Sequence, residues 1–252
     1  MHTRFDPYPE QRAGGFTRVD GTVQFYLRIH ALLDSFEQRP VVLDFGAGRG
    51  ASFEHAVPIH WSLLDLRSKA EKVIGVDVTD AVLGNPSLTE AHVIATGSPL
   101  PLDDRSVDLV VADHTFEHLA DPAPVARELT RVLRPGGWLC ARTPNRSGYI
   151  AVMARAVPNR LHAPVLRRVQ PTRRREDVFD TVYCLNTPRD LGRHFPTIQY
   201  EHIIYGWDAE PAYAANSALA TAVFCLLGRL TPDALRSTLM IFLRRRAVDL
   251  TG

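Results

Sequence analysis

Short, continuous apolar runs alternate with helix-like segments along this chain, and that alternation limits its fold more than any other feature. The three clearest runs are Val41–Leu43, Val73–Val76 and Val107–Ala112. Continuous apolar strands separated by helices are typical of a parallel sheet that helices cover on both faces. Because crossovers between parallel strands are right-handed, the pattern predicts a doubly wound, mostly parallel α/β sheet.

Weaker patterns and turn residues predict the remaining elements. Further strands are expected at His92–Ala95, Trp138–Arg142, Ile198–Tyr205 and Thr238–Leu243, and helices at Val19–Phe36, from Asp121 to Pro135, from Thr187 to Phe195 and at Ala209–Leu230. Leu133 is expected on the second of these helices, which Pro135-Gly136-Gly137 should end. We interpret the segment between Gly50 and Val73 as an inserted loop.

A glycine-rich loop, DFGAGRG, follows the first strand and is expected to open a helix. Gly46, Gly48 and Gly50, with Ala47 between them, allow a tight turn and let a ligand approach the backbone closely. The loop also fits the fingerprint of dinucleotide-binding proteins. It therefore predicts a nucleoside-containing ligand without choosing among cofactors.

Three carboxylates, Asp44, Asp77 and Asp113, stand at or near the ends of predicted strands. Ligands of doubly wound sheets bind at that carboxyl edge. A carboxylate at Asp44 suits a ligand's ammonium group, directly or through water, and would repel the pyrophosphate of a nicotinamide cofactor. Asp77 suits the ribose hydroxyls of a nucleoside, whether that nucleoside belongs to a nicotinamide cofactor or to a ligand with an ammonium group. A plain helix cap, with Thr79 beside it, is the alternative for Asp77.

Several motifs in order carry a family resemblance. They are Leu100-Pro101, the strand Val107–Ala112, the pair Glu117-His118, the turn Leu133-Arg134-Pro135-Gly136-Gly137, and Thr143-Pro144-Asn145. Over about residues 38–146 the chain resembles the methyltransferase type 11 family, which includes the ubiquinone and menaquinone biosynthesis methyltransferases. The resemblance implies a Rossmann-like class I methyltransferase with a seven-stranded sheet. It also implies S-adenosylmethionine (SAM) as cofactor and S-adenosylhomocysteine (SAH) as product.

The cofactor-binding residues then expected are Asp44, Gly46, Ala47, Gly48, Gly50, Asp77, Val78, Gly97, Ser98 and Asp113. The chain departs from the family in one place. Where the family often has an acidic residue before Leu-Pro, this sequence has Thr96-Gly97-Ser98. We therefore expect backbone groups around Gly97 to bind the adenine.

The resemblance also defines how the chain is divided. We treat residues 1–252 as a single methyltransferase domain. Residues 1–37 are an N-terminal helical segment and 38–146 the SAM-binding core. Residues 147–186 are a substrate-side insertion, and 187–252 complete the sheet.

Catalysis needs positioning of donor and acceptor and, for a hydroxyl acceptor, a general base. His118 is the first candidate because imidazole titrates near neutral pH. Glu117 is expected to orient it, and His114 is the second candidate. A structural Glu-His pair is the alternative. His114 and His118 are four residues apart, a metal-binding spacing on one helix, but no metal is expected.

The sequence predicts a SAM-dependent methyltransferase for a small-molecule, sugar or lipid-linked acceptor, acting by O-methylation. Arginines in the insertion suit a phosphate or carboxylate on that acceptor. The alternative is a solvated loop whose charge Glu176, Asp177 and Asp180 balance. Two other functions stay open: a NAD(P)-dependent oxidoreductase with a Rossmann domain, and a non-catalytic binding protein of methyltransferase fold.

Composition limits partners and location. The net charge of +1 and the lack of an NPPY-like motif argue against a nucleic-acid substrate. Three scattered cysteines and no signal peptide favour the cytoplasm. The apolar stretch Ala218–Leu230 is too short to span a bilayer. It is expected to pack on the sheet, with a homodimer face or a peripheral membrane contact as alternatives.

Overall fold

The computed structural model describes residues 7–53, 57–156, 181–209, 222–223, 226–228 and 230–247. The strands are β1 (Val41–Phe45), β2 (Lys72–Asp77), β3 (Glu90–Val93), β4 (Val107–Asp113), β5 (Leu133–Pro144), β6 (Tyr200–Trp207) and β7 (Thr238–Arg245). The α-helices are α1 (Gly21–Leu33), α2 (Pro58–Leu64), α3 (Pro122–Val132), α4 (Tyr149–Ala156) and α6 (Pro188–His194).

The strands form one seven-stranded sheet in the order β3-β2-β1-β4-β5-β7-β6. Strand β2 is parallel to its neighbours β3 and β1, and β4 is parallel to its neighbours β1 and β5. Strand β7 runs antiparallel to both of its neighbours, β5 and β6. The prediction of a doubly wound, mostly parallel sheet is confirmed. Strand order reverses between β1 and β4, so the ligand crevice is expected at the carboxyl ends of these two strands.

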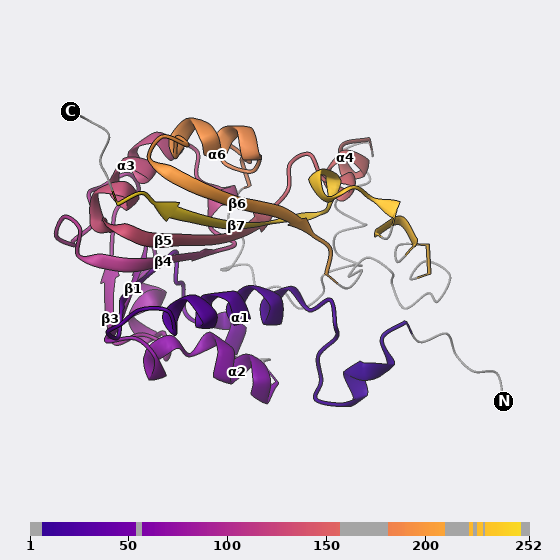
Figure 1. The fold of residues 1–252 in the computed structure, drawn as a ribbon, viewed down its shortest axis with the longest axis horizontal. Coiled ribbons are helices and arrows are strands. Elements are labelled where there is room, and N and C mark those ends of the chain that lie inside the picture. Colours follow the sequence, from indigo (N-terminus) through magenta and orange to yellow (C-terminus); the bar gives the residue numbers. More distant parts are fainter. Residues whose placement is uncertain are drawn as a thin grey trace.

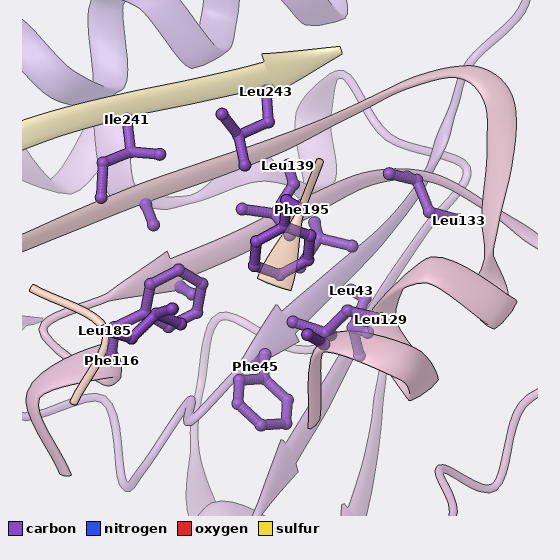
Figure 2. Close-up of a cluster of buried hydrophobic side chains, with 14 of the residues drawn as sticks. Leu43, Phe45, Phe116, Leu129, Leu133, Leu139, Leu185, Phe195, Ile241 and Leu243 are labelled. Carbon is purple, nitrogen blue, oxygen red and sulfur yellow. The ribbon is translucent and has the colours of Figure 1, made fainter. Parts of the chain in front are cut away.

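Helices cover both faces of the sheet, with α1 and α2 on one side and α3 and α6 on the other (Figure 1). Each face has its own buried apolar cluster. The α3 side includes Leu129, Phe195 and Leu139, and Leu185 lies beside Phe116 in the same cluster (Figure 2). Burial of both faces explains why the strands are apolar throughout instead of alternating.

The first helix is shorter than its apolar pattern suggested. It spans Gly21–Leu33 because Asp20 caps it, accepting a hydrogen bond from the main-chain N–H of Val23 at 3.0 Å. Strand boundaries also differ from the prediction. Strand β3 begins two residues before the predicted strand and ends at Val93. In both cases the apolar pattern located the element, and capping or strand pairing decided its ends.

The Pro135-Gly136-Gly137 turn lies within a strand, contrary to our prediction. Helix α3 ends at Val132, and Leu133 pairs with Val107 as the first residue of β5. The register between β4 and β5 shifts after that pair. Gly136 has a φ of 84°, and a Cβ on Gly137 would lie 2.7 Å from the carbonyl oxygen of Asp108. The glycines therefore form an irregularity in the strand that a larger residue would obstruct.

The segment after the glycine loop is helical, so our interpretation of it as an inserted loop is wrong. A three-residue 3-10 helix, η2 (Ala51–Phe53), directly follows the loop, and α2 begins at Pro58. Leu63 and Leu64 are buried in the cluster that α1 also joins. This segment is thus the crossover between β1 and β2.

Some predictions lie outside the described residues. These are most of the helix at Ala209–Leu230, the proposed membrane or dimer face within it, and the arginine run of the insertion. Within the described ranges, none of the helices has the length and apolar character needed to cross a bilayer.

Candidate active site

The glycine loop lies at the carboxyl end of β1, as expected. Gly46, Gly48 and Gly50 all have positive φ, at 79°, 52° and 75°. A Cβ on Gly46 would overlap the side chain of Thr115, and one on Gly50 would lie 2.9 Å from Oδ1 of Asn85. Nothing lies within 4 Å of the Cβ position of Gly48. Two glycines thus permit close packing of the loop, whereas the third leaves open space beside the backbone.

Asn85 holds this loop in place, and sequence analysis missed it. Its Nδ2 donates to the carbonyl oxygens of Ala47, at 2.9 Å, and Gly48, at 3.2 Å. Its Oδ1 accepts from the N–H and hydroxyl of Ser87. The only sequence signal was the turn-forming Asn-Pro-Ser run, which does not reveal a partner nearly forty residues away.

Asp77 connects the end of β2 to the same loop. One carboxylate oxygen accepts from the N–H of Gly48 at 2.9 Å, and the other accepts from the N–H and hydroxyl of Thr79. Asp77 is not a helix cap, because the following 3-10 helix (Asp80–Gly84) has Thr79 at its N-cap and no side-chain capping bond. Carboxylate oxygens accept more than one hydrogen bond each, so these contacts leave capacity for hydroxyl groups of a ligand. Val78, the next residue, is half exposed.

Asp44 is the unsatisfied charge of the crevice. Burial raises the pKa of its carboxyl group to about 7, and the negative charges of Asp113 and Asp77 contribute to the rise. Within the part of the chain that the structure describes, no group donates a hydrogen bond to this carboxylate. A cationic ligand group placed here would relieve both the repulsion and the missing hydrogen bond.

Asp113, in contrast, is satisfied by protein groups. Arg142 binds its carboxylate through Nε and Nη2, at 2.7 and 2.8 Å, and Tyr26 of α1 also hydrogen-bonds to it. Burial is the largest influence on the pKa of Asp113 and would raise it, but the charges of Arg142 and His114 and the hydrogen bonds from Arg142 and Tyr26 together keep that pKa below its usual value. Arg142 also donates to Thr22 and lies over the ring of Phe25, so this ion pair attaches α1 to the sheet.

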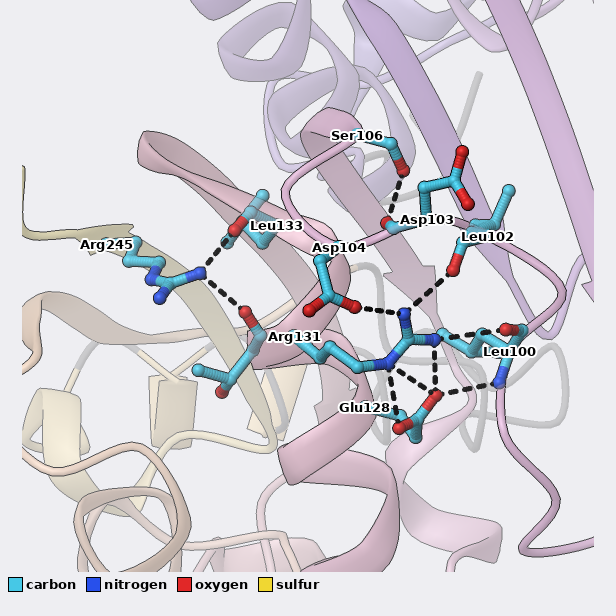
Figure 3. A network of polar contacts seen from close by, with 10 residues as sticks. Leu100, Leu102, Asp103, Asp104, Ser106, Glu128, Arg131, Leu133 and Arg245 are labelled. Atoms are coloured by element: carbon cyan, nitrogen blue, oxygen red, sulfur yellow. Dashed lines mark hydrogen bonds and ion pairs between the residues drawn. The ribbon is translucent and has the colours of Figure 1, made fainter.

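The loop that carries Gly97 and Ser98 is anchored to α3. Gly97 has a φ of 74°, with open space at its Cβ position. Ser98 donates through its hydroxyl to the carbonyl oxygen of Ala95. Just beyond, Arg131 donates to the carbonyl oxygens of Leu100 and Leu102, and Glu128 accepts from the N–H of Leu100 (Figure 3). The loop's accessible backbone is therefore held at a fixed position.

His114 and Glu117 form a pair after β4. His114 has a φ of 55°, a conformation uncommon outside glycine, and its side chain is 49% exposed. Its Nδ1 lies 3.2 Å from Oε1 of Glu117, while the other carboxylate oxygen accepts from the hydroxyl of Thr143 at 2.8 Å. Burial opposes ionisation of Glu117, yet the hydrogen bonds from His114 and Thr143 keep its pKa below the ordinary value.

His118 lies in η5 (Phe116–His118), a 3-10 turn ahead of α3. Because η5 begins after His114, the two histidines do not share a helix, and the condition for their joint metal binding is not met. Among the described residues, no cluster of three or more His, Cys, Asp or Glu side chains is arranged to hold a metal. The Glu117 side chain, which we expected to orient His118, bonds to His114 and Thr143.

The part of the chain that carries these residues is similar to known proteins. Residues 43–141, from β1 to β5, match a family model described as a methyltransferase domain. Over 108 residues the chain is 37% identical to a probable S-adenosylmethionine-dependent methyltransferase of Mycolicibacterium smegmatis, covering 42% of this chain and 38% of that protein. Residues 43–141 are therefore similar to a methyltransferase domain, and this relative is named as SAM-dependent.

The methyltransferase domain has other relatives. One is a ubiquinone biosynthesis O-methyltransferase of Albidiferax ferrireducens, which is 33% identical over 115 residues, covering 45% of this chain and 44% of the relative. The chain thus spans less than half the length of these two curated relatives. A solved SAM-dependent methyltransferase structure from Archaeoglobus fulgidus matches with a TM-score of 0.53 at 14% identity, covering 94% of this chain and 97% of that one. At that identity the match supports the Rossmann-like class I methyltransferase fold.

Proposed function

We propose that this protein is an enzyme that transfers a methyl group from SAM to a hydroxyl group of a small-molecule, sugar or lipid-linked acceptor. The observation that carries the proposal is Asp44. Its carboxylate lies at the strand-order reversal beside a glycine loop and has no partner among the described residues. SAM carries an amino group for such a carboxylate and no phosphate that it would repel.

The residues of the crevice fit SAM. Asp44 would bind the amino group, and Asp77 would accept hydrogen bonds from the ribose hydroxyls. Gly48 leaves open space through which the ligand can approach the backbone. Backbone groups at Gly97 and Ser98 would contact the adenine, with Val78 at its side. Asp113 would act indirectly, by holding Arg142 and α1 in position.

SAM, when bound, supplies a methyl group that its sulfonium already activates. The protein must align the acceptor with that group and exclude water. It must also take the proton that the acceptor hydroxyl loses. We assign that role to His114. With Nδ1–H donated to Glu117, the neutral imidazole keeps its Nε2 lone pair for a proton. Glu117 is then a positioning residue, buried and fixed by Thr143.

Substitution of the two histidines tests this assignment. We expect His114→Ala to lower the turnover number about a hundredfold or more, as loss of a general base does, while SAH affinity stays unchanged. Methyl transfer from labelled SAM to an acceptor found by screening provides the rate. His118→Ala is the matched variant. A larger loss in His118→Ala than in His114→Ala would assign the base role to His118 and contradict our choice.

Calorimetry tests the cofactor. We expect SAH to bind the purified protein and NADH not to bind. Asp44→Asn should weaken SAH binding at least tenfold, because a charge-assisted hydrogen bond is lost. Binding of NADH without SAH would favour the oxidoreductase alternative. SAH binding without methyl transfer to any tested acceptor would favour a non-catalytic binding protein.

Our proposal for location is the cytoplasm. It rests on Cys140 and Cys184, which are both free thiols in the described structure. Fractionation of the native host, with the protein detected by antibody, would test this. A homodimer is a further proposal, which the elution volume of the purified protein would test.

A further inference from the structure

An open hollow lies where β5 ends, between the start of α4 and α6. It is a cavity of about 430 Å³. Its lining is Arg146, Ser147, Val152, Thr187, Arg189, Asp190 and Arg193. None of these residues belongs to the SAM crevice. The cavity is open to solvent, and three guanidinium groups belong to its lining.

Two buried asparagines hold the walls of this cavity in place. Asn145 donates to the carbonyl oxygens of Ala234 and Arg236, at 3.0 and 2.8 Å, and accepts from the N–H of Ser147. Asn186 donates through Nδ2 to the carbonyl oxygen of Pro144, and its main-chain carbonyl oxygen accepts from the N–H of Arg146. The segment that carries Arg146 is therefore bonded to the segment that leads into α6, which carries Arg189 and Arg193, so the cavity is formed before a ligand arrives.

The charge of the cavity is positive. Arg146, Arg189 and Arg193 are exposed, and Asp190 is the only acid among the described residues that line the cavity. The Asp190 carboxylate is already engaged. One oxygen accepts from the hydroxyl of Thr187 at 2.6 Å, and the other lies 3.4 Å from Nη1 of Arg193. Among the described residues of the lining, arginines therefore outnumber acids, which suits a phosphate group.

The cavity is connected to the catalytic pair by hydrogen bonds. Asn186 donates at 2.6 Å to the hydroxyl of Thr143, and that hydroxyl donates to Glu117, the partner of His114. The main-chain oxygen of Glu117 also accepts from the N–H of Val182, in the segment that leads to the cavity. An acceptor bound at the arginines would therefore be connected through these hydrogen bonds to His114, the proposed base.

We propose that this cavity binds a phosphate ester group of the methyl acceptor. The inference rests on the proposed function and narrows its acceptor to phosphorylated compounds. Guanidinium forks bind phosphate oxygens in pairs, and the hydroxyl of Ser147 adds a polar group to the wall. A soluble sugar phosphate and a lipid phosphate offer the same chemistry to these groups.

Binding of phosphate compounds to the SAH-loaded protein tests this proposal. The probes are inorganic phosphate, glucose 1-phosphate, and phosphatidylcholine vesicles that contain phosphatidic acid. We expect the double variant Arg189→Gln/Arg193→Gln to raise the Kd for the phosphate probes about tenfold or more, and Arg146→Gln to raise it less. Tighter binding of glucose 1-phosphate would indicate a soluble acceptor, and tighter binding of the vesicles a lipid acceptor.

The matched control is Arg39→Gln/Arg127→Gln, which removes the same charge from exposed positions outside the cavity. It should change the Kd less than twofold. The proposal fails if wild-type protein binds no phosphate probe, or if the cavity variant and the control bind equally. SAH affinity separates the two proposals. Unchanged SAH binding with failed phosphate binding overturns only this inference, whereas loss of SAH binding by the wild type overturns the proposed function.

Discussion

At the residue scale, Asp44 shows how a binding group can weaken the fold that carries it. Its carboxyl group has a raised pKa of about 7, chiefly because it is buried and also because Asp113 and Asp77 repel its charge. Between its unfolded value near 4 and this value, the folded protein holds a proton that the unfolded chain has released. The free energy of unfolding therefore falls as the pH rises through that window.

This reasoning predicts the stability of Asp44→Asn. At about pH 8 the variant should unfold with a free energy higher than that of the wild type, by on the order of a few kcal/mol, because each pH unit of the shift contributes about 1.4 kcal/mol. At about pH 4 the difference should vanish, since wild-type Asp44 is protonated in the fold there. Urea unfolding without SAM or SAH measures both values. A variant less stable than the wild type at about pH 8 would contradict the assigned environment of Asp44.

At the element scale, the ion pair of Arg142 and Asp113 joins three elements. Arg142 lies on β5 and Asp113 on β4, while Tyr26 and Thr22 of α1 bond to one or the other. Both charges are largely shielded from solvent. A second pair, Arg134 with Asp108, is at the other end of the same two strands. Its arginine is 46% exposed, against 10% for Arg142, whereas the two carboxylates are similarly shielded. Because both are Arg–Asp pairs between β4 and β5, comparing them shows the effect of burying the arginine.

We expect Arg142→Met to lower the free energy of unfolding by about 3–5 kcal/mol, because it leaves Asp113 charged and unpaired in a buried place. Arg134→Met should cost about 1 kcal/mol or less, because the guanidinium group is partly exposed and Asp108 keeps its hydrogen bond from the N–H of Val41. Denaturant titration of both variants at neutral pH measures the difference. Equal losses would show that the Arg142 pair contributes no more than a surface ion pair.

At the scale of the whole molecule, segments far apart in sequence share one sheet and one core. Strands β6 and β7 extend the sheet beyond the matched methyltransferase domain, and β7 pairs along the length of β5. Leu185 and Phe195 pack into the cluster that β1 and α3 also form (Figure 2). This sharing supports our division of the chain as a single domain, which predicts one cooperative unfolding transition.

Leu185→Ala tests that cooperativity. Leu185 is 1% exposed, so its truncation should lower the free energy of unfolding by about 2–5 kcal/mol. Leu235→Ala, at a position 45% exposed, should change it by about 0.5 kcal/mol or less. Circular dichroism and tryptophan fluorescence should give coincident unfolding curves for both variants. Separate transitions would mean that the C-terminal strands form an independent unit.

The sequence by itself determined the parallel core of the sheet, the glycine loop and the carboxylates at the strand ends. These are local signals: a buried strand needs an apolar run, and a tight turn with positive φ needs glycine at Gly46, Gly48 or Gly50. The order of such signals was also enough to indicate the methyltransferase family. Helix ends, the helical crossover after the loop, and the strand through Pro135-Gly136-Gly137 were not recoverable, because pairing and packing decided them.

Only the tertiary structure decided which side chains meet. It joined Glu117 to His114 and Thr143, Arg142 to Asp113, and Asn85 to the glycine loop. It also brought Arg146 together with Arg189 and Arg193 around one cavity. The physical reason is that most of these partners lie tens of residues apart. A charge or hydrogen-bonding group acts over a few ångströms, so its partner is set by how the elements pack and not by its neighbours along the chain.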